Sequence, residues 1–223
     1  RSVKNIVAEI KHWIDTIGTN KFVFRDPVFS INRKHTIELC KEIINQNLKI
    51  EYLIETHLNN LDDEMISLLK KSGLKMVYIG IESSSSDVLK DIKRFTVKND
   101  DQQKIINKLV DNDIFVKSMF MFGNPEDTEE SVKNTINYSM LLSNQLVQYS
   151  VFTPYPGTPI FSNYKDKITE TKYEQFNQYN LIFKHKNLDN IKIKNLKNYG
   201  YKKFYLRIKN LPIIAKSCLS LLK

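Results

Sequence analysis

The chain has 223 residues, of which 41% are hydrophobic and 26% charged, and its formal net charge is +9. This balance is that of a globular protein, so it excludes intrinsic disorder, collagen-like repeats and low complexity. No stretch approaches the roughly 18 consecutive apolar residues of a membrane span, and the first residues lack the apolar segment of a signal peptide. We therefore expect a soluble, cytoplasmic protein without a transmembrane segment.

The positive charge is confined to one part of the chain. Residues 1–164 hold 20 Lys and Arg against 21 Asp and Glu, whereas residues 165–223 hold 14 against 4. We therefore predict a nearly neutral main domain over 1–164 and a basic, helical C-terminal extension over 165–223. An anionic partner should be sought at the extension rather than at the main domain.

Helical and strand patterns alternate from the N-terminus onward. Apolar residues at helical spacing predict a helix over 3–17 that stops at Gly18, and a β-rich segment predicts a short strand over 22–24. One helix should carry Asp62, Asp63 and Glu64 in its first turn, with Gly73 just past its end. The same criteria predict further helices over 34–46, 61–72, 99–112 and 127–142, and further strands over 50–55, 75–81, 114–122 and 146–152.

The order of these elements favours a parallel sheet. Strands that recur every 25–40 residues or so, with an amphipathic helix between them, are typical of right-handed βαβ crossovers. Because a helix comes first, we predict an α/β fold that resembles a TIM-like barrel missing its opening unit. An open, doubly wound sheet is the competing architecture, and in both the chemistry lies at the carboxyl ends of the strands.

Polar residues gather at these predicted strand ends. Carboxylates there can bind an ammonium group or ribose hydroxyls, and turns rich in Gly or Pro let a flat ring approach the backbone closely. The set therefore suits a polar, nucleoside-like ligand. It comprises Asp26, Glu55, His57, Glu82, Ser83, the turn Gly123-Asn124-Pro125-Glu126 and the turn Thr153-Pro154-Tyr155-Pro156-Gly157-Thr158-Pro159.

Each of these positions also has a plainer structural interpretation. Asp26 before a proline can be a turn acceptor, and Ser83–Ser86 can cap a short helix. A single histidine such as His57 is more often a surface residue than a ligand, and Gly123–Pro125 can simply end a strand. The shared placement at one end of one sheet is what favours a site.

Four segments resemble, in order and spacing, the radical S-adenosylmethionine (SAM) enzymes of the cobalamin-associated class. They are FVFRDPVF at 22–29, YIGIES at 78–83, MFGNPE at 121–126 and TPYPGTP at 153–159. The GIES and PYPGTP parts are the most diagnostic, and the resemblance runs from residue 1 to residue 207. It implies a partial (β/α)6 barrel whose first strand is missing from this chain.

The family's chemistry belongs to its cofactors. Three thiolates of a CxxxCxxC loop hold a [4Fe–4S] cluster, and electron transfer from it cleaves SAM to a 5′-deoxyadenosyl radical that abstracts hydrogen from the substrate. The resemblance thus implies SAM, the cluster, a small-molecule substrate and an electron donor such as flavodoxin or ferredoxin. The class also allows cobalamin, carried by an N-terminal domain. Methylation, cyclisation and rearrangement are all outcomes known in the family.

Residue roles are carried over by position alone. The Glu-Ser pair at 82–83 would contact the ribose or the methionine end of SAM, and the turns after the last two strands would lie along the nucleoside. The cofactor-binding candidates are Asp26, Glu82, Ser83, Gly123, Thr153 and Pro154, and the substrate-side candidates are Glu55 and His57.

The chain also departs from the family pattern. The CxxxCxxC motif is absent, so we assign no metal ligand in this chain, and neither Cys40 nor Cys218 is given to a cluster. His57 stands where relatives commonly have an arginine, and Ser84-Ser85 replaces a turn that usually contains glycine. We expect the cluster loop upstream of residue 1, and we expect the chain alone not to cleave SAM.

Two other functions stay open. One is a non-catalytic barrel that has lost the cluster and binds a nucleotide-like ligand or a protein partner. The other is binding of nucleic acid or an anionic membrane by the extension, where aromatic residues are interleaved with lysines. We favour a plainer interpretation without nucleic acid, in which one face of a helix packs on the barrel. That face would comprise Tyr173, Phe176, Tyr179 and Phe183.

Overall fold

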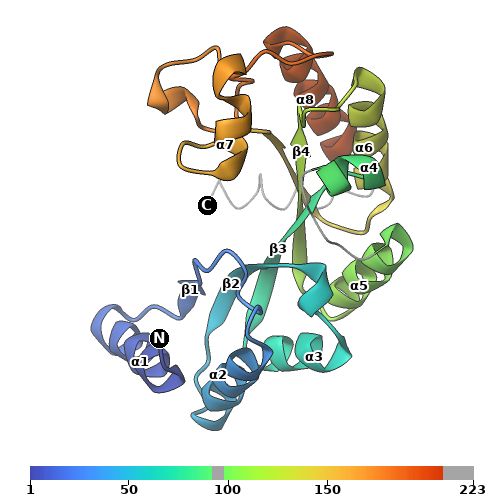
Figure 1. Ribbon diagram of the computed structural model, residues 1–223. Helices are drawn as coiled ribbons and strands as arrows, with labels where there is room; N and C mark the ends of the chain where they lie inside the picture. Colours follow the sequence, from blue (N-terminus) through green and yellow to red (C-terminus); the bar gives the residue numbers. More distant parts are fainter. Residues whose placement is uncertain (92–97, 208–223) are drawn as a thin grey trace, which may run out of the picture. The chain divides into compact units, whose positions relative to one another are not determined.

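The computed structural model describes residues 1–91 and 98–207, and within them helices and strands alternate as predicted (Figure 1). The β-strands are β1 (Lys21–Val23), β2 (Glu51–Thr56), β3 (Leu74–Glu82), β4 (Phe115–Phe122) and β5 (Leu146–Val151). The α-helices are α1 (Val3–Ile17), α2 (Arg33–Asn45), α3 (Asp63–Lys71), α4 (Ser86–Asp91), α5 (Asn99–Asp111), α6 (Glu129–Leu141), α7 (Pro159–Tyr164) and α8 (Asn190–Tyr205). Short 3-10 helices cover η1 (Leu58–Asn60), η2 (Lys165–Lys167) and η3 (Tyr173–Gln175).

The strand order identifies the type of sheet. Among the described residues the sheet runs β1-β2-β3-β4-β5, so each strand lies beside its neighbours in the sequence. Strand β2 is parallel to β1 and to β3, with Glu55 opposite Tyr78. A doubly wound sheet needs a reversal of strand order, whereas sequential order is that of a β/α barrel. The fold is therefore a partial TIM-like barrel, as predicted, and the doubly wound alternative is wrong.

The described chain divides into two compact units, which we consider separately. The first unit holds 1–80, 98–118 and 142–146, and the second unit holds 81–91, 119–141 and 147–207. Strands β3 and β4 begin in the first unit and end in the second. The predicted division into 1–164 and 165–223 stays a prediction, and part of that extension, including Cys218, lies outside the described residues.

Local capping explains where the helices begin and end. Gly18 ends α1 in the left-handed conformation, with φ 66°, as predicted. In α3 the prediction needs a correction, because Asp62 is the N-cap rather than a first-turn residue, and its side chain accepts a hydrogen bond from the Met65 backbone. Gly73 follows that helix with φ 111°, and a side chain there would collide with the Ile50 carbonyl oxygen.

A hydrogen-bonded core holds the first unit together. The Tyr52 hydroxyl, on the buried face of β2, lies 2.6 Å from the Ser72 hydroxyl and donates to the Leu69 carbonyl. Cys40 of α2 is fully buried in contact with Tyr52, with its sulfur 4.0 Å from the hydroxyl oxygen. The helices α1, α2 and α3 pack in sequence order beside one another.

In the second unit, α8 packs against α6, and Figure 1 shows the two helices side by side. Gly200 allows this close packing, because a Cβ there would lie 3.2 Å from Ile136 of α6 and 2.9 Å from the Tyr149 ring of β5. The expectation of a single aromatic helix face before α8 is wrong. Tyr173 is in the 3-10 helix η3 and Tyr179 in irregular chain, both largely exposed, whereas Phe183 is buried in a bridge to Ile168.

No helix within residues 1–91 and 98–207 combines the length and the apolar character needed to cross a membrane.

Candidate cofactor site at the strand ends

Glu82 ends β3 in a conformation that is rare for a residue with a side chain. Its φ is 67°, and the Ser83 backbone N–H donates to the Ile81 carbonyl across it, at 2.9 Å. A three-residue turn with positive φ at its centre is uncommon and strained. Strain of this kind persists only where the surrounding structure holds it, and it clusters at functional sites. Glu82 is partly exposed.

Helix α6 anchors the turn that follows Glu82. The Thr135 hydroxyl, buried on α6, accepts from the Ser84 backbone N–H at 3.3 Å and lies 3.2 Å from the Ser84 hydroxyl. The Ser83 hydroxyl is buried and accepts from the Ser85 backbone at 3.1 Å. The helix-cap interpretation is thus partly confirmed, since α4 begins at Ser86. The anchoring Thr135 was not singled out from the sequence.

A buried carboxylate organises the turn after β4. Asp127 accepts from the Asn124 backbone N–H at 2.9 Å, from the Asn124 amide at 3.1 Å, and from the Ser131 hydroxyl at 2.6 Å. Burial raises the pKa of Asp127, and the hydrogen bonds from Ser131 and Asn124 oppose that shift. The sequence had assigned Asp127 to the start of a helix, but α6 begins at Glu129. Asp127 instead fixes the loop that precedes α6.

His185 fastens this loop from the C-terminal segment. Its Nδ1 accepts from the backbone N–H groups of Asn187 and Leu188, so Nε2 carries the proton and donates to the Asn124 carbonyl at 2.8 Å. The Asn187 amide also donates to the Asp127 carbonyl. The loop therefore has a fixed backbone. The Asn124 Oδ1 atom is buried without a hydrogen-bond partner among the described residues, which leaves an acceptor for a polar ligand.

The other second-unit candidates are more deeply packed. A Cβ on Gly123, whose φ is 75°, would lie 3.3 Å from Leu181 and 3.4 Å from Ile193, so this glycine allows close packing of the C-terminal segment. Thr153 is buried and donates to the Val151 carbonyl, and Pro154 beside it is buried. Contacts of these three residues with a nucleoside stay predictions.

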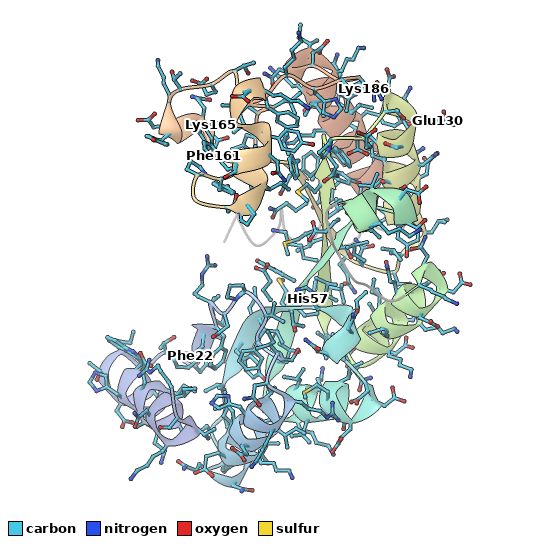
Figure 2. All side chains as sticks on the ribbon, in the orientation of Figure 1. Phe22, His57, Glu130, Phe161, Lys165 and Lys186 are labelled. Carbon is cyan, nitrogen blue, oxygen red and sulfur yellow. The ribbon has the colours of Figure 1, made fainter. Side chains whose placement is uncertain are left out.

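The first unit holds the remaining candidates. Asp26 is exposed beyond β1, and its carboxylate has no hydrogen bond in the described residues, so nothing supports a role as a turn acceptor. Glu55 is half-buried on β2, and His57 follows the end of that strand (Figure 2). Lys117 on β4, which the sequence analysis did not single out, lies 4.5 Å above the Tyr78 ring.

A cluster does not fit the described part of this chain. Residues 1–91 and 98–207 contain no group of three or more His, Cys, Asp or Glu side chains that could hold a metal ion. Cys40 is buried in the first-unit core, where burial raises the pKa of its thiol. A polar organic ligand fits better, because the second unit offers a carboxylate on a strained backbone turn and a buried acceptor without a partner among the described residues.

Comparison with known proteins decides the family. The model of the radical SAM superfamily matches residues 1–139. This chain belongs to the radical SAM superfamily. The chain is 28% identical to an anaerobic magnesium-protoporphyrin IX monomethyl ester cyclase of Cereibacter sphaeroides, over 93% of this chain and 34% of the relative. It is 26% identical to a bacteriochlorophyllide d C-12(1)-methyltransferase of Chlorobaculum tepidum, over 86% of this chain and 42% of that relative. The chain thus spans less than half the length of these relatives.

Solved structures share the fold of this radical SAM chain. TsrM, a radical SAM methyltransferase of Kitasatospora setae with cobalamin and a [4Fe–4S] cluster bound, matches with a TM-score of 0.69 and 19% identity, over 74% of this chain and 32% of TsrM. Coproporphyrinogen III oxidase of Escherichia coli, a radical SAM enzyme, matches with a TM-score of 0.61 and 13% identity, over 90% of this chain and 45% of the oxidase. The predicted family is confirmed, and cobalamin-bound members are among its structural relatives.

Proposed function

We propose that this chain is the SAM-binding barrel portion of a longer radical SAM enzyme that methylates, cyclises or rearranges a small-molecule substrate. The observation that carries the proposal is the strained turn at Glu82, which holds a carboxylate at the end of a barrel strand. Relatives named as a cyclase and a methyltransferase support the first two outcomes. When bound, the [4Fe–4S] cluster would supply the electron that cleaves SAM, and an electron donor such as flavodoxin or ferredoxin would reduce the cluster again.

The residues of the second unit would bind and orient SAM. SAM carries an ammonium group and ribose hydroxyls, and the Glu82 carboxylate can accept hydrogen bonds from either. The unpartnered Asn124 oxygen would accept a further hydrogen bond, with Asp127 and His185 holding its loop. Gly123, Thr153 and Pro154 would line the nucleoside. Because residues 1–91 and 98–207 contain no group of three possible metal ligands, none of the roles proposed for these residues is that of a cluster ligand.

Calorimetric titration of SAM into the chain tests the assignment. Glu82→Gln removes the charge while keeping the shape, and we expect at least a tenfold loss of affinity. Glu130→Gln is the matched control, because Glu130 is an exposed carboxylate on α6 of the same unit (Figure 2). The affinity of the Glu130→Gln variant for SAM should stay within twofold of that of the wild type. Equal affinity of the Glu82→Gln variant and the wild type would contradict the proposed role of Glu82.

A further inference from the structure

Three charged or aromatic side chains form a layer across the sheet within the first unit. Residues of β2, β3 and β4 alternate between buried and less buried positions, and Glu55, Tyr78 and Lys117 are all at less buried positions. Glu55 stands opposite Tyr78 in the strand register, and the Lys117 Nζ lies 4.5 Å from the centre of the Tyr78 ring. The three neighbouring strands therefore present these side chains at one level.

Lys117 has an ammonium group that lacks an acceptor. Burial lowers its pKa, and Glu55 opposes that shift through its charge. No carboxylate of the described residues lies within 4.0 Å of the Lys117 nitrogen, and no hydrogen bond from it is formed there. A half-buried ammonium with three donors and no hydrogen-bond acceptor among the described residues is incompletely satisfied by protein groups. Such a group is suited to binding an anion.

Two members of the layer come well before the ends of their strands, whereas Glu55 is one residue before the end of β2. Lys117 is five residues before the end of β4, and Tyr78 is four residues before the end of β3. Glu55 adds a negative charge at the same level, so an anion with a hydrogen-bond donor beside it complements both charged groups. The aromatic face of Tyr78 favours an apolar portion next to the anion.

We propose that Lys117 binds a carboxylate of the ligand, with Glu55 setting the strength of that contact by its charge. The proposal rests on the proposed function, since the carboxylate belongs either to the substrate or to SAM. In both cases the chemistry is the same, an ammonium–carboxylate hydrogen bond at a half-buried position.

Nuclear magnetic resonance of the protein with lysine labelled with ¹³C at Cε provides the readout. The signal that is absent from the Lys117→Arg variant is assigned to Lys117. Hexanoate is the carboxylate probe, and hexanamide is its neutral match. We expect hexanoate to shift the Lys117 signal saturably and to raise the pKa of Lys117, and hexanamide to do neither. Glu55→Gln should tighten hexanoate binding about threefold or more, because it removes a nearby like charge. Lys75, exposed and paired with Glu51 at 3.4 Å, is the control signal and should not saturate.

SAM and decarboxylated SAM distinguish the two sources of the carboxylate. A Lys117 shift with SAM but not with its decarboxylated analogue supports the proposal and assigns the group to the cofactor. A shift with hexanoate and none with SAM supports it and assigns the group to the substrate. The proposal is overturned if neither hexanoate nor SAM shifts the signal saturably, or if hexanamide acts equally. Calorimetric SAM binding by the wild type tests the proposed function separately.

Discussion

Replacing Asp127 should show how strongly one buried carboxylate fixes the loop after β4. In Asp127→Ala the Asn124 backbone N–H and amide both lose their acceptor, at sites that are fully buried. A buried donor without a partner costs about 1–3 kcal/mol. Since removing a desolvated carboxylate recovers part of this, we expect a net loss of about 2–4 kcal/mol in the free energy of unfolding.

Asp127→Asn is the matched control for this substitution. Its single carbonyl oxygen can still accept both hydrogen bonds from Asn124, and its amide can donate to the Ser131 hydroxyl, so we expect a loss of about 1 kcal/mol or less. Urea unfolding followed by far-ultraviolet circular dichroism measures both. The reasoning is refuted if the alanine variant is as stable as the wild type, or if the two variants lose the same amount.

The wild type and Asp127→Asn together test the ionisation of Asp127. Its pKa in the folded state lies above the ordinary value of 3.8, so the folded chain binds the proton more tightly than the unfolded chain. This contribution to stability is fully present when the pH is below about 3.8, and it is lost as the pH rises through the raised pKa. The stability of the wild type minus that of Asp127→Asn should therefore fall as the pH increases across this interval. A difference that rises with pH would mean that hydrogen bonding outweighs burial.

Two further predictions concern packing in each unit. Gly200→Ala should destabilise the second unit by about 1 kcal/mol in a urea titration, because overpacking against Tyr149 outweighs the gain in helix propensity. The exposed Asn198→Ala on the same helix should be neutral or stabilising, and an equal effect of both would argue against the close contact. In a Cys218→Ser variant, Cys40 should react with a thiol reagent only when urea unfolds the chain, since burial raises the pKa of its thiol. Fast reaction in the native state would contradict the buried position.

The sequence located the elements well because their physical signals are local. Amphipathic periodicity places β4 and α2 within a residue or two of their observed bounds, and glycine marks the end of α1. Asp62 was misplaced by one position because an acid is favourable both as an N-cap and in the first turn. The aromatic spacing from Tyr173 to Phe183 matched a helix, yet tertiary contacts in that segment produce irregular chain.

The site was predictable in composition but not in conformation. The sequence placed Glu82 at a strand end, whereas its positive φ depends on the turn that Thr135 anchors from a distant helix. His185 was missed because its partner, the Asn124 carbonyl, is 61 residues away in the sequence. Lys117 had a usable signal, since a lysine in an otherwise apolar, alternating strand must point to its less buried face.

The most direct test of the central claim uses the longer radical SAM enzyme that we propose contains this chain. It should be purified without oxygen, loaded with iron and sulfide, and supplied with a reductant and SAM. The account predicts consumption of SAM with release of 5′-deoxyadenosine, dependent on the cluster and reduced at least tenfold by Glu82→Gln, while Glu130→Gln retains activity. A cluster-loaded protein that neither binds nor consumes SAM would contradict the account.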